Sequence, residues 1–242
     1  LECLEYRGYD SAGIAVAGPK GLGMVKCVGS VANLKAKLET TPLEGSVGIG
    51  HTRWATHGGV TDENAHPHAD PSRKVVLIHN GIVENFHELR QELSAQGVAF
   101  LSETDTEVAV CLIARLYALN GGNPQEALRG ACRRFRGSFA FVVLFTDLPD
   151  RFYCVRKGPP LILGVAQGEA FCASDATALL PYTHDILFLE DDQIAELSAK
   201  GIALSDFEGR PLPAELSTVD WDPEMASKGM YPHFMLKEIH DQ

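Results

Sequence analysis

The spacing of apolar residues changes twice along this chain, and the order of those changes limits the folds open to it. Short apolar segments bounded by glycine, typical of buried strands, occur at residues 11–16 and 46–50, and helical spacing separates them at 31–39. Helical spacing then dominates residues 86–135, and short apolar segments return from residue 138. Strands at both ends with helices grouped in the middle predict an α+β layered fold with mainly antiparallel sheets.

The middle helices carry recognisable start signals. Thr104 followed by Glu107 is a capping-box pattern ahead of the apolar stretch 108–119. Asn123-Pro124 opens the next helix, since proline is favoured at the first helical position. We therefore expect two consecutive helices here.

A β-branched run at residues 75–78 leads into Asn80-Gly81. Asn-Gly is a strong turn signal, so we expect the strand to end there and to present backbone N–H groups at its end. Further strands are expected at residues 138–145, 152–156, 161–165, 170–173, 186–189 and 193–197.

Composition and charge exclude several classes of protein. The net charge of −11 repels polyanions and no basic stripe is present, so nucleic acid is not an expected partner. The longest apolar runs are far shorter than the roughly 20 residues that cross a bilayer, which predicts a soluble protein. No flexible linker divides the 242 residues before the last twenty or so, so we expect one domain over residues 1–222 and a tail over 223–242.

The cysteines and the start of the chain indicate the compartment. The six cysteines form no Cys-x-x-Cys pair, which favours free thiols in a reducing cytosol. The first residues lack the basic start and apolar core of a signal peptide. We expect a cytoplasmic protein.

Five polar segments carry the functional information. They are YRGYDSAG at residues 6–13, GHTRWATHG at 50–58, NAHPH at 64–68, HNG at 79–81 and ETDTE at 103–107. Together they resemble the class II glutamine amidotransferases, whose glutaminase domains are N-terminal-nucleophile hydrolases. The first two segments are closer to the members that aminate a sugar phosphate than to the phosphoribosyl members of the purine pathway. The resemblance covers close to the whole chain and implies a layered αββα sandwich.

The resemblance assigns the charged residues to free glutamine. Arg53 becomes the clamp for the α-carboxylate, which its planar guanidinium fits, where the residue alone would indicate a loop ion pair. Asp105 becomes the partner of the α-ammonium, although an acidic residue is favoured at a helix start in any case. Both assignments are predictions from the family pattern.

The resemblance also assigns Asn80 and Gly81 to an oxyanion hole, where a plain hairpin turn would use the same dipeptide. It places Trp54, Thr56 and His57 in a loop that closes over bound glutamine. The histidines near His66 lack the spacing and the supporting ligands of a metal site, so His66 is expected near the site in a structural role. No metal or organic cofactor is implied.

The nucleophile of this class is a cysteine at the first residue, and its own α-amino group is the general base. Cys3 is internal and directly precedes the YRGYDSAG segment, so the resemblance implies that a strand and a helix, on the order of 20 residues, are missing ahead of Leu1. We therefore expect the chain as given to lack the N-terminal strand and the nucleophile, and to be inactive alone.

The parent enzyme implied by the resemblance passes ammonia to a sugar isomerase domain of the same polypeptide, through which it forms a homodimer. That domain would convert fructose 6-phosphate to glucosamine 6-phosphate, and residues 223–242 would lead into it. Three alternatives stay open. They are a class II amidotransferase with another acceptor, a non-catalytic glutamine-binding regulatory module, and an α+β scaffold that binds nothing.

Overall fold

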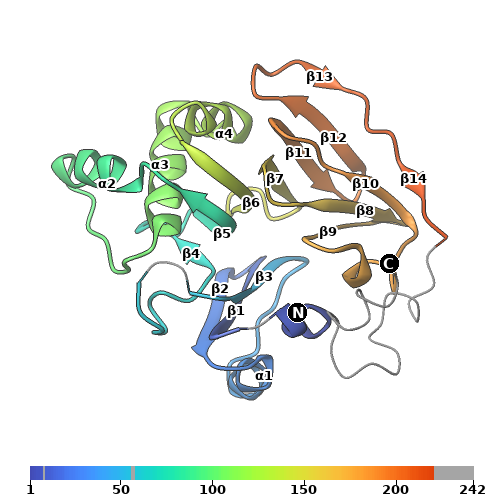
Figure 1. Ribbon diagram of the computed structural model, residues 1–242, viewed down its shortest axis with the longest axis horizontal. Helices are drawn as coiled ribbons and strands as arrows, with labels where there is room; N and C mark the ends of the chain where they lie inside the picture. The colour runs from blue at the N-terminus through green and yellow to red at the C-terminus, as the bar shows by residue number, and fades with distance from the viewer. Residues whose placement is uncertain (8, 56–57, 221–242) are drawn as a thin grey trace, which may run out of the picture.

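The computed structural model describes residues 1–7, 9–55 and 58–220 (Figure 1). The predicted tail at residues 223–242 lies outside these residues. In the described part, no helix combines the length and the apolar character that a bilayer crossing requires.

An antiparallel sheet of seven strands forms the centre of the molecule. From one edge to the other its strands are β13 (Pro211–Leu212), β12 (Gly201–Asp206), β11 (Gln193–Ser198), β7 (Arg151–Lys157), β6 (Gly137–Phe145), β5 (Val75–Val83) and β4 (His68–Ala69).

The sequence of β6 explains why both faces of this sheet are covered. Phe139 and Phe141 are fully buried in one core cluster, while Ala140, Val142 and Leu144 belong to a second cluster on the opposite face. Successive side chains of a strand point to opposite faces, so a continuous apolar run must be packed on both sides.

Three helices cover one face of the central sheet (Figure 1). They are α2 (Phe86–Ala95), α3 (Asp105–Leu119) and α4 (Pro124–Cys132). Both predicted helix starts are confirmed, at Asp105 and at Pro124.

The cap of α3 differs in part from the predicted capping box. Thr104 Oγ1 accepts a hydrogen bond from Glu107 N at 3.2 Å, as the pattern predicts. The Glu107 carboxylate, however, accepts from Leu101 N at 2.8 Å and Ser102 N at 2.7 Å rather than from the cap residue. The glutamate therefore secures the loop ahead of the helix.

Two smaller sheets pack on the other face of the central sheet. One has the order β2 (Gly21–Val28), β1 (Ser11–Gly18), β3 (Val47–Arg53), and the other has the order β14 (Ser217–Thr218), β10 (Asp185–Phe188), β8 (Ile162–Ala166), β9 (Glu169–Ala173). Short 3₁₀ helices, η1 (Glu2–Arg7) and η2 (Ala176–Ala178), complete the described elements.

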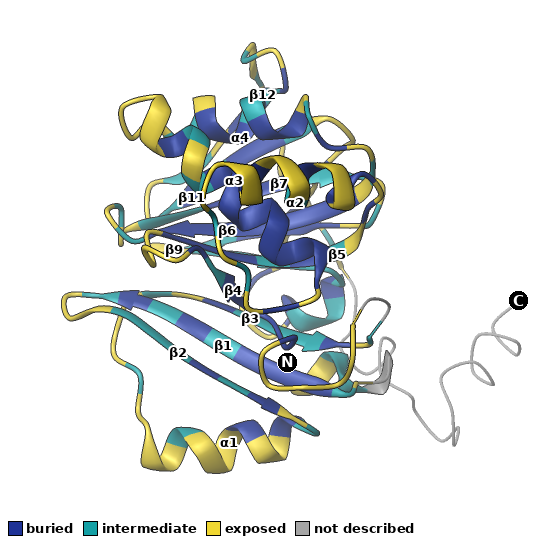
Figure 2. Cartoon of the chain, turned by 90° about the vertical axis from the view of Figure 1, so that its left-hand side faces the viewer, coloured by how far each residue is buried: buried dark blue, intermediate teal, exposed yellow. Residues whose placement is uncertain are grey.

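Helix α1 (Val31–Thr40) lies on the outer face of the three-stranded sheet, where Val31 and Leu34 pack with Ala12 and Val25 (Figure 2). The molecule therefore has four layers. Three helices cover the central sheet, the two smaller sheets form the next layer, and α1 covers the outer face of the three-stranded one. This order confirms the α+β sandwich with antiparallel sheets that was expected from the sequence.

The prediction that the strand ends at Asn80-Gly81 is wrong. Strand β5 runs through both residues to Val83, with Asn80 opposite Ala140 and Gly81 opposite Phe139. Pairing with β6 over nine residue positions outweighs the local turn preference of Asn-Gly.

Candidate active site

A cavity of about 1010 Å³ lies between β3 and β9, and both strands line it. Among the described residues, β3 pairs only with β1 and β9 only with β8, so each is the edge of its sheet. Ala140 and Val142 of the central sheet also line the cavity. Unpaired strand edges present backbone N–H and C=O groups, so this cavity can hold polar groups as well as apolar ones.

Asn80 lies on β5 and lines the cavity. Its Oδ1 lies 2.9 Å from Nε2 of His51, which is on β3. Burial lowers the pKa of His51, so the imidazole is neutral, and Nε2–H is the donor because an amide oxygen only accepts. This bond uses the oxygen of the Asn80 amide and leaves its N–H groups as the part able to meet a ligand.

Gly81 occupies a position that a side chain could not. Its φ angle is +112°, a conformation that L side chains rarely adopt. A Cβ atom there would lie 2.2 Å from the carbonyl oxygen of Ser138 on β6. Glycine inside a strand often marks a place where a ligand or another backbone comes close.

Asp105, the first residue of α3, is 6% exposed and lines the cavity. Its Oδ2 accepts a hydrogen bond from Val83 N at 2.9 Å and lies 3.7 Å from His79 Nδ1. The carboxylate is therefore tied to the end of β5, beside Asn80 and Gly81.

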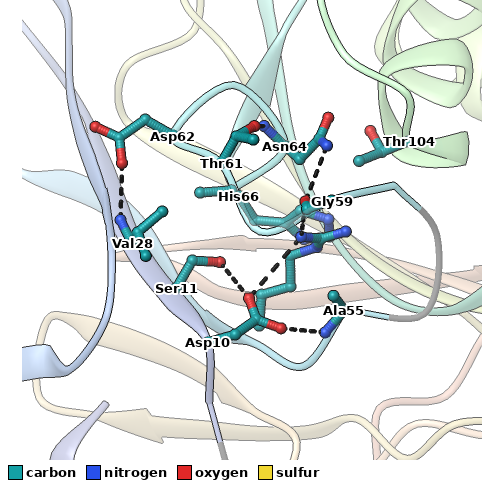
Figure 3. A network of polar contacts seen from close by, with 12 residues as sticks. Asp10, Ser11, Val28, Ala55, Gly59, Thr61, Asp62, Asn64, His66 and Thr104 are labelled. Atoms are coloured by element: carbon teal, nitrogen blue, oxygen red, sulfur yellow. Dashed lines mark hydrogen bonds and ion pairs between the residues drawn. The ribbon is translucent and has the colours of Figure 1, made fainter.

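Arg53 ends β3 and is 5% exposed. Figure 3 shows the polar contacts that surround it, with Asp10, Ala55 and Gly59 labelled. Arg53 Nη1 donates to Gly59 O at 3.4 Å and lies 3.9 Å from Asp10 Oδ1. Asp10 also accepts hydrogen bonds from Ser11 Oγ and Ala55 N, so one carboxylate holds both Arg53 and the start of the next loop. Burial lowers the pKa of Arg53 from a very high ordinary value, and the guanidinium stays charged.

The remaining predicted residues divide into three cases. Trp54 is 69% exposed and lines the cavity. His66 is buried and also lines it. Thr56 and His57 lie outside the described residues.

Four histidines gather at the cavity: His66, His68 and His79 are buried, and His51 is half-buried. His66 Nε2 and His79 Nδ1 are each 3.1 Å from Thr106 Oγ1, and the ring centroids of His51 and His66 are 4.4 Å apart. Burial holds the pKa values of His66 and His68 well below the usual range, so both are neutral at neutral pH. In the part of the chain that the structure describes, no three His, Cys, Asp or Glu side chains are arranged to hold a metal ion.

Sequence reasoning missed three residues that hold the site. They are Asp10, His51 and Asn64. All three lie inside the recognised segments, but the long-range partners of Asp10, His51 and Asn64 are 45, 29 and 39 residues away in the chain. Their place in those segments was the only sign in the sequence that these residues matter. It does not reveal which atoms their side chains bind.

The arrangement brings a buried cation, a buried anion and an amide donor with a backbone N–H to one cavity. A guanidinium and a carboxylate can hold the two charged groups of an α-amino acid. The amide N–H groups of Asn80 and a sterically open backbone at Gly81 can stabilise a developing oxyanion. The cavity therefore fits chemistry on the side chain of a free amino acid.

Comparison with known proteins agrees with this interpretation. A family model described as a glutamine amidotransferase domain matches residues 51–181. The chain is 50% identical over 242 residues to the glutamine–fructose-6-phosphate aminotransferase (isomerizing) of Thermus thermophilus and 48% identical over 243 residues to that of Pyrococcus horikoshii. All of this chain is matched, but only 39% and 40% of those relatives.

A solved structure shares the fold. The glutamine phosphoribosylpyrophosphate amidotransferase from B. subtilis matches with a TM-score of 0.70 at 24% identity, over 85% of this chain and 45% of that one. The family model spans more than half of the sequence, including Arg53, Asn80, Gly81 and Asp105. The chain thus belongs to the glutamine amidotransferase domain family.

Proposed function

We propose that this chain is the part of a longer enzyme that hydrolyses the side-chain amide of glutamine to glutamate and ammonia. The observation that carries the proposal is that Arg53, Asp105, Asn80 and Gly81 all line one cavity. These groups match the charged groups of glutamine and the oxygen of its side-chain amide.

Glutamine binds through its two charged ends in this proposal. The guanidinium of Arg53 pairs with the α-carboxylate, and the carboxylate of Asp105 pairs with the α-ammonium. Trp54, Thr56 and His57 belong to the loop that covers the bound substrate. His66 lines the same cavity and holds Thr106 through the contact of its Nε2 with Thr106 Oγ1.

The nucleophile in this mechanism is the thiolate of an N-terminal cysteine in the longer enzyme. Its sulfur bonds to the amide carbon, and the carbonyl electrons move to the oxygen, which accepts hydrogen bonds from the Asn80 amide and the Gly81 N–H. The cysteine's α-amino group, with an ordinary pKa of about 7.7–8.0, takes the thiol proton and returns it to the leaving nitrogen. The C–N bond breaks to release ammonia, and water then hydrolyses the thioester to glutamate.

The open edges of β3 and β9 support this mechanism, because a further strand can enter between them and bring the sulfur beside Asn80. Neither Cys3, which is exposed, nor Cys172 on β9 is needed in this role.

The ammonia acceptor in our proposal is fructose 6-phosphate, bound by a sugar isomerase domain of the same polypeptide. The named relatives supply this part of the proposal, since the chain matches only about two fifths of their length. A cytoplasmic homodimer formed through that domain completes it.

Glutamate release by the full-length protein, with fructose 6-phosphate present, tests the proposal. Asn80→Ala is expected to lower kcat by about 10²- to 10³-fold with little change in KM, because the oxyanion forms only during the reaction. Arg53→Ala is expected to raise KM by at least about tenfold, since it removes a charged contact. Arg210→Ala, at an exposed arginine, is the matched control and should change neither.

Three outcomes contradict the proposal in different ways. Glutamate release that survives replacement of the N-terminal cysteine by alanine would remove the mechanism. Glutamine binding without any turnover would favour the regulatory module. Glutamine affinity that is unchanged by Arg53→Ala and Asp105→Ala would favour the scaffold.

A further inference from the structure

Asn64 connects the two charged groups of the cavity. It lies in the loop after Arg53 and is 3% exposed. Its Nδ2 donates to Gly59 O at 2.9 Å (Figure 3), and its Oδ1 accepts from Glu103 N at 3.0 Å. These two partners are backbone groups, one an acceptor and one a donor, and Nδ2 also donates to Glu103 Oε2 at 3.4 Å, so the orientation of the amide is fixed by chemistry.

Each of the two backbone partners leads to one charged group. Gly59 O also accepts from Nη1 of Arg53 at 3.4 Å, so one carbonyl oxygen holds both the amide of Asn64 and the guanidinium. Glu103 lies two residues ahead of Asp105, at the entry to α3. The amide of Asn64 is thus the bridge between the segment that holds Arg53 and the segment that holds Asp105.

Other bonds support the same bridge. Asn64 N donates to Thr61 Oγ1 at 3.2 Å, which closes the loop on itself. Glu103 Oε2 accepts from Gly59 N at 3.2 Å, a second link between the same two segments. The side chain of Glu103 is exposed, whereas Asn64 is buried, so the amide is the link shielded from water.

We propose that Asn64 is a positioning residue that sets the separation between the guanidinium of Arg53 and the carboxylate of Asp105, and so selects a ligand with both an α-carboxylate and an α-ammonium. The inference rests on the proposed glutamine site. Asn64 itself touches no substrate. A ligand with only one of the two charged groups does not depend on the separation, and this difference makes the role measurable.

The test measures competitive inhibition of glutamate release from glutamine by the full-length enzyme. The inhibitors are L-glutamate, which has both α-groups, and glutarate, which lacks the α-ammonium. We expect Asn64→Ala to reduce the preference for glutamate over glutarate on the order of 10-fold, since small misplacements of binding groups are costly. Asn64→Asp keeps the acceptor for Glu103 N and loses the donor to Gly59 O, and it should reduce the preference as well.

Asn85 provides a matched control. It is 9% exposed, its Nδ2 donates to Arg134 O at 2.9 Å and its Oδ1 accepts from Arg136 N at 2.9 Å. Asn85→Ala therefore removes an equivalent pair of hydrogen bonds outside the cavity. It should lower stability as Asn64→Ala does and leave the preference for glutamate unchanged.

A double variant distinguishes a role of Asn64 in positioning Asp105 from a general loosening of the cavity. If Asn64 acts through Asp105, Asp105→Ala alone abolishes the preference, and adding Asn64→Ala changes it no further. A preference that Asn64→Ala leaves intact overturns the inference while the proposed function stands. A wild-type enzyme that releases no glutamate, or that binds glutarate as tightly as glutamate, instead overturns the proposed glutamine site.

Discussion

The two sides of the cavity are held in place by different kinds of bond. Residues 78–83 of β5 and Asp105, called here the ladder wall, are fixed by backbone pairing with β6 and by the bond from Val83 N to Asp105. Residues 54–55 and 58–67, which follow Arg53 and are called here the loop wall, are fixed mainly by side chains.

Four side chains hold the loop wall in place. Two of them, Lys26 and Asp10, belong to other segments, and two, Asp62 and Asn64, belong to the loop wall itself. Lys26 Nζ donates to Ala65 O at 2.7 Å and to Glu63 O at 3.0 Å. Asp62 accepts from Val28 N and from Lys37, both at 2.8–2.9 Å. Asn64 and Asp10 hold the segments nearest Arg53.

The difference has a functional meaning. A wall built from a strand ladder cannot shift one residue without disturbing its neighbours, which suits groups that must stabilise an oxyanion. A wall held by separate side-chain bonds, each contributing about 0.5–1.5 kcal/mol, can be loosened one bond at a time. Substitutions in the ladder wall should therefore affect catalysis, and those around the loop wall should affect binding.

The strongest test of this comparison is Gly81→Ala in the ladder wall. The new Cβ would lie 2.2 Å from Ser138 O, at a φ of +112°, so the strand must move. We expect kcat to fall at least about 10²-fold and the free energy of unfolding to fall by about 2 kcal/mol or more. Urea denaturation and glutamate release measure both.

Gly97→Ala is the control for backbone strain alone. Gly97 has a φ of +89° but open space around its Cβ position, and it lies after α2. It should lower stability and leave kcat unchanged. If Gly81→Ala behaves in the same way, the ladder wall has no special part in catalysis.

The comparison also shows what the sequence could predict. Long apolar segments such as β6 and α3 can be predicted because a buried strand or helix shows in the spacing of its own apolar residues. Strand β2 was missed because its glycines weaken the pattern and its pairing with β1 decides its structure. Asn80-Gly81 was interpreted as a turn because the ladder with β6 cannot be seen in the local sequence.

The site was predicted unevenly for the same reason. Arg53, Asp105, Asn80 and Gly81 were found through a resemblance, and the structure brings all four to one cavity. Several bonds around them join distant residues, such as His51 to Asn80 at 29 positions and Ala55 to Asp10 at 45. Only the fold determines such pairs.

Acidification tests whether the buried histidines, which lie near both walls, govern the stability of the protein at low pH. The pKa values of His51, His66 and His68 are lowered by burial from the ordinary 6.5, so below about pH 6.5 the unfolded chain takes up protons that the folded chain refuses. Stability is therefore full above this pH and falls as pH drops toward the lowered values. The slope is at most about 1.4 kcal/mol per pH unit for each imidazole.

Urea denaturation between pH 7.5 and 5.5 measures this slope. Because the pKa values are lowered, the free energy of unfolding should fall as the pH drops. His68→Asn should reduce the slope, because one of the buried imidazoles is removed. His87→Asn, at an exposed position on α2, should not. Equal slopes in all three proteins would show that the buried histidines do not govern acid stability.

Asp10→Ala tests the loop wall and should have a smaller effect on turnover than Gly81→Ala. It removes the ion pair at 3.9 Å to Arg53 and the acceptor for Ala55 N. We expect KM for glutamine to rise about tenfold while kcat changes less than about threefold, since Arg53 binds the ground state and the transition state alike. Steady-state glutamate release separates the two constants. A loss confined to kcat would show that the loop wall also takes part in catalysis.

Thr104→Ala should give the smallest effect and defines where the ladder wall ends. Thr104 caps α3 through Glu107 N, and its Oγ1 also lies 3.1 Å from His68 Nε2. Loss of the cap should cost about 1 kcal/mol of stability, and Asn123→Ala at the cap of α4 should cost about the same. Because Asp105 follows Thr104 directly, only Thr104→Ala should also raise KM, by about twofold to threefold. If both variants leave KM unchanged, the bond from Val83 N holds Asp105 without help from the helix cap, and the ladder wall ends at that bond.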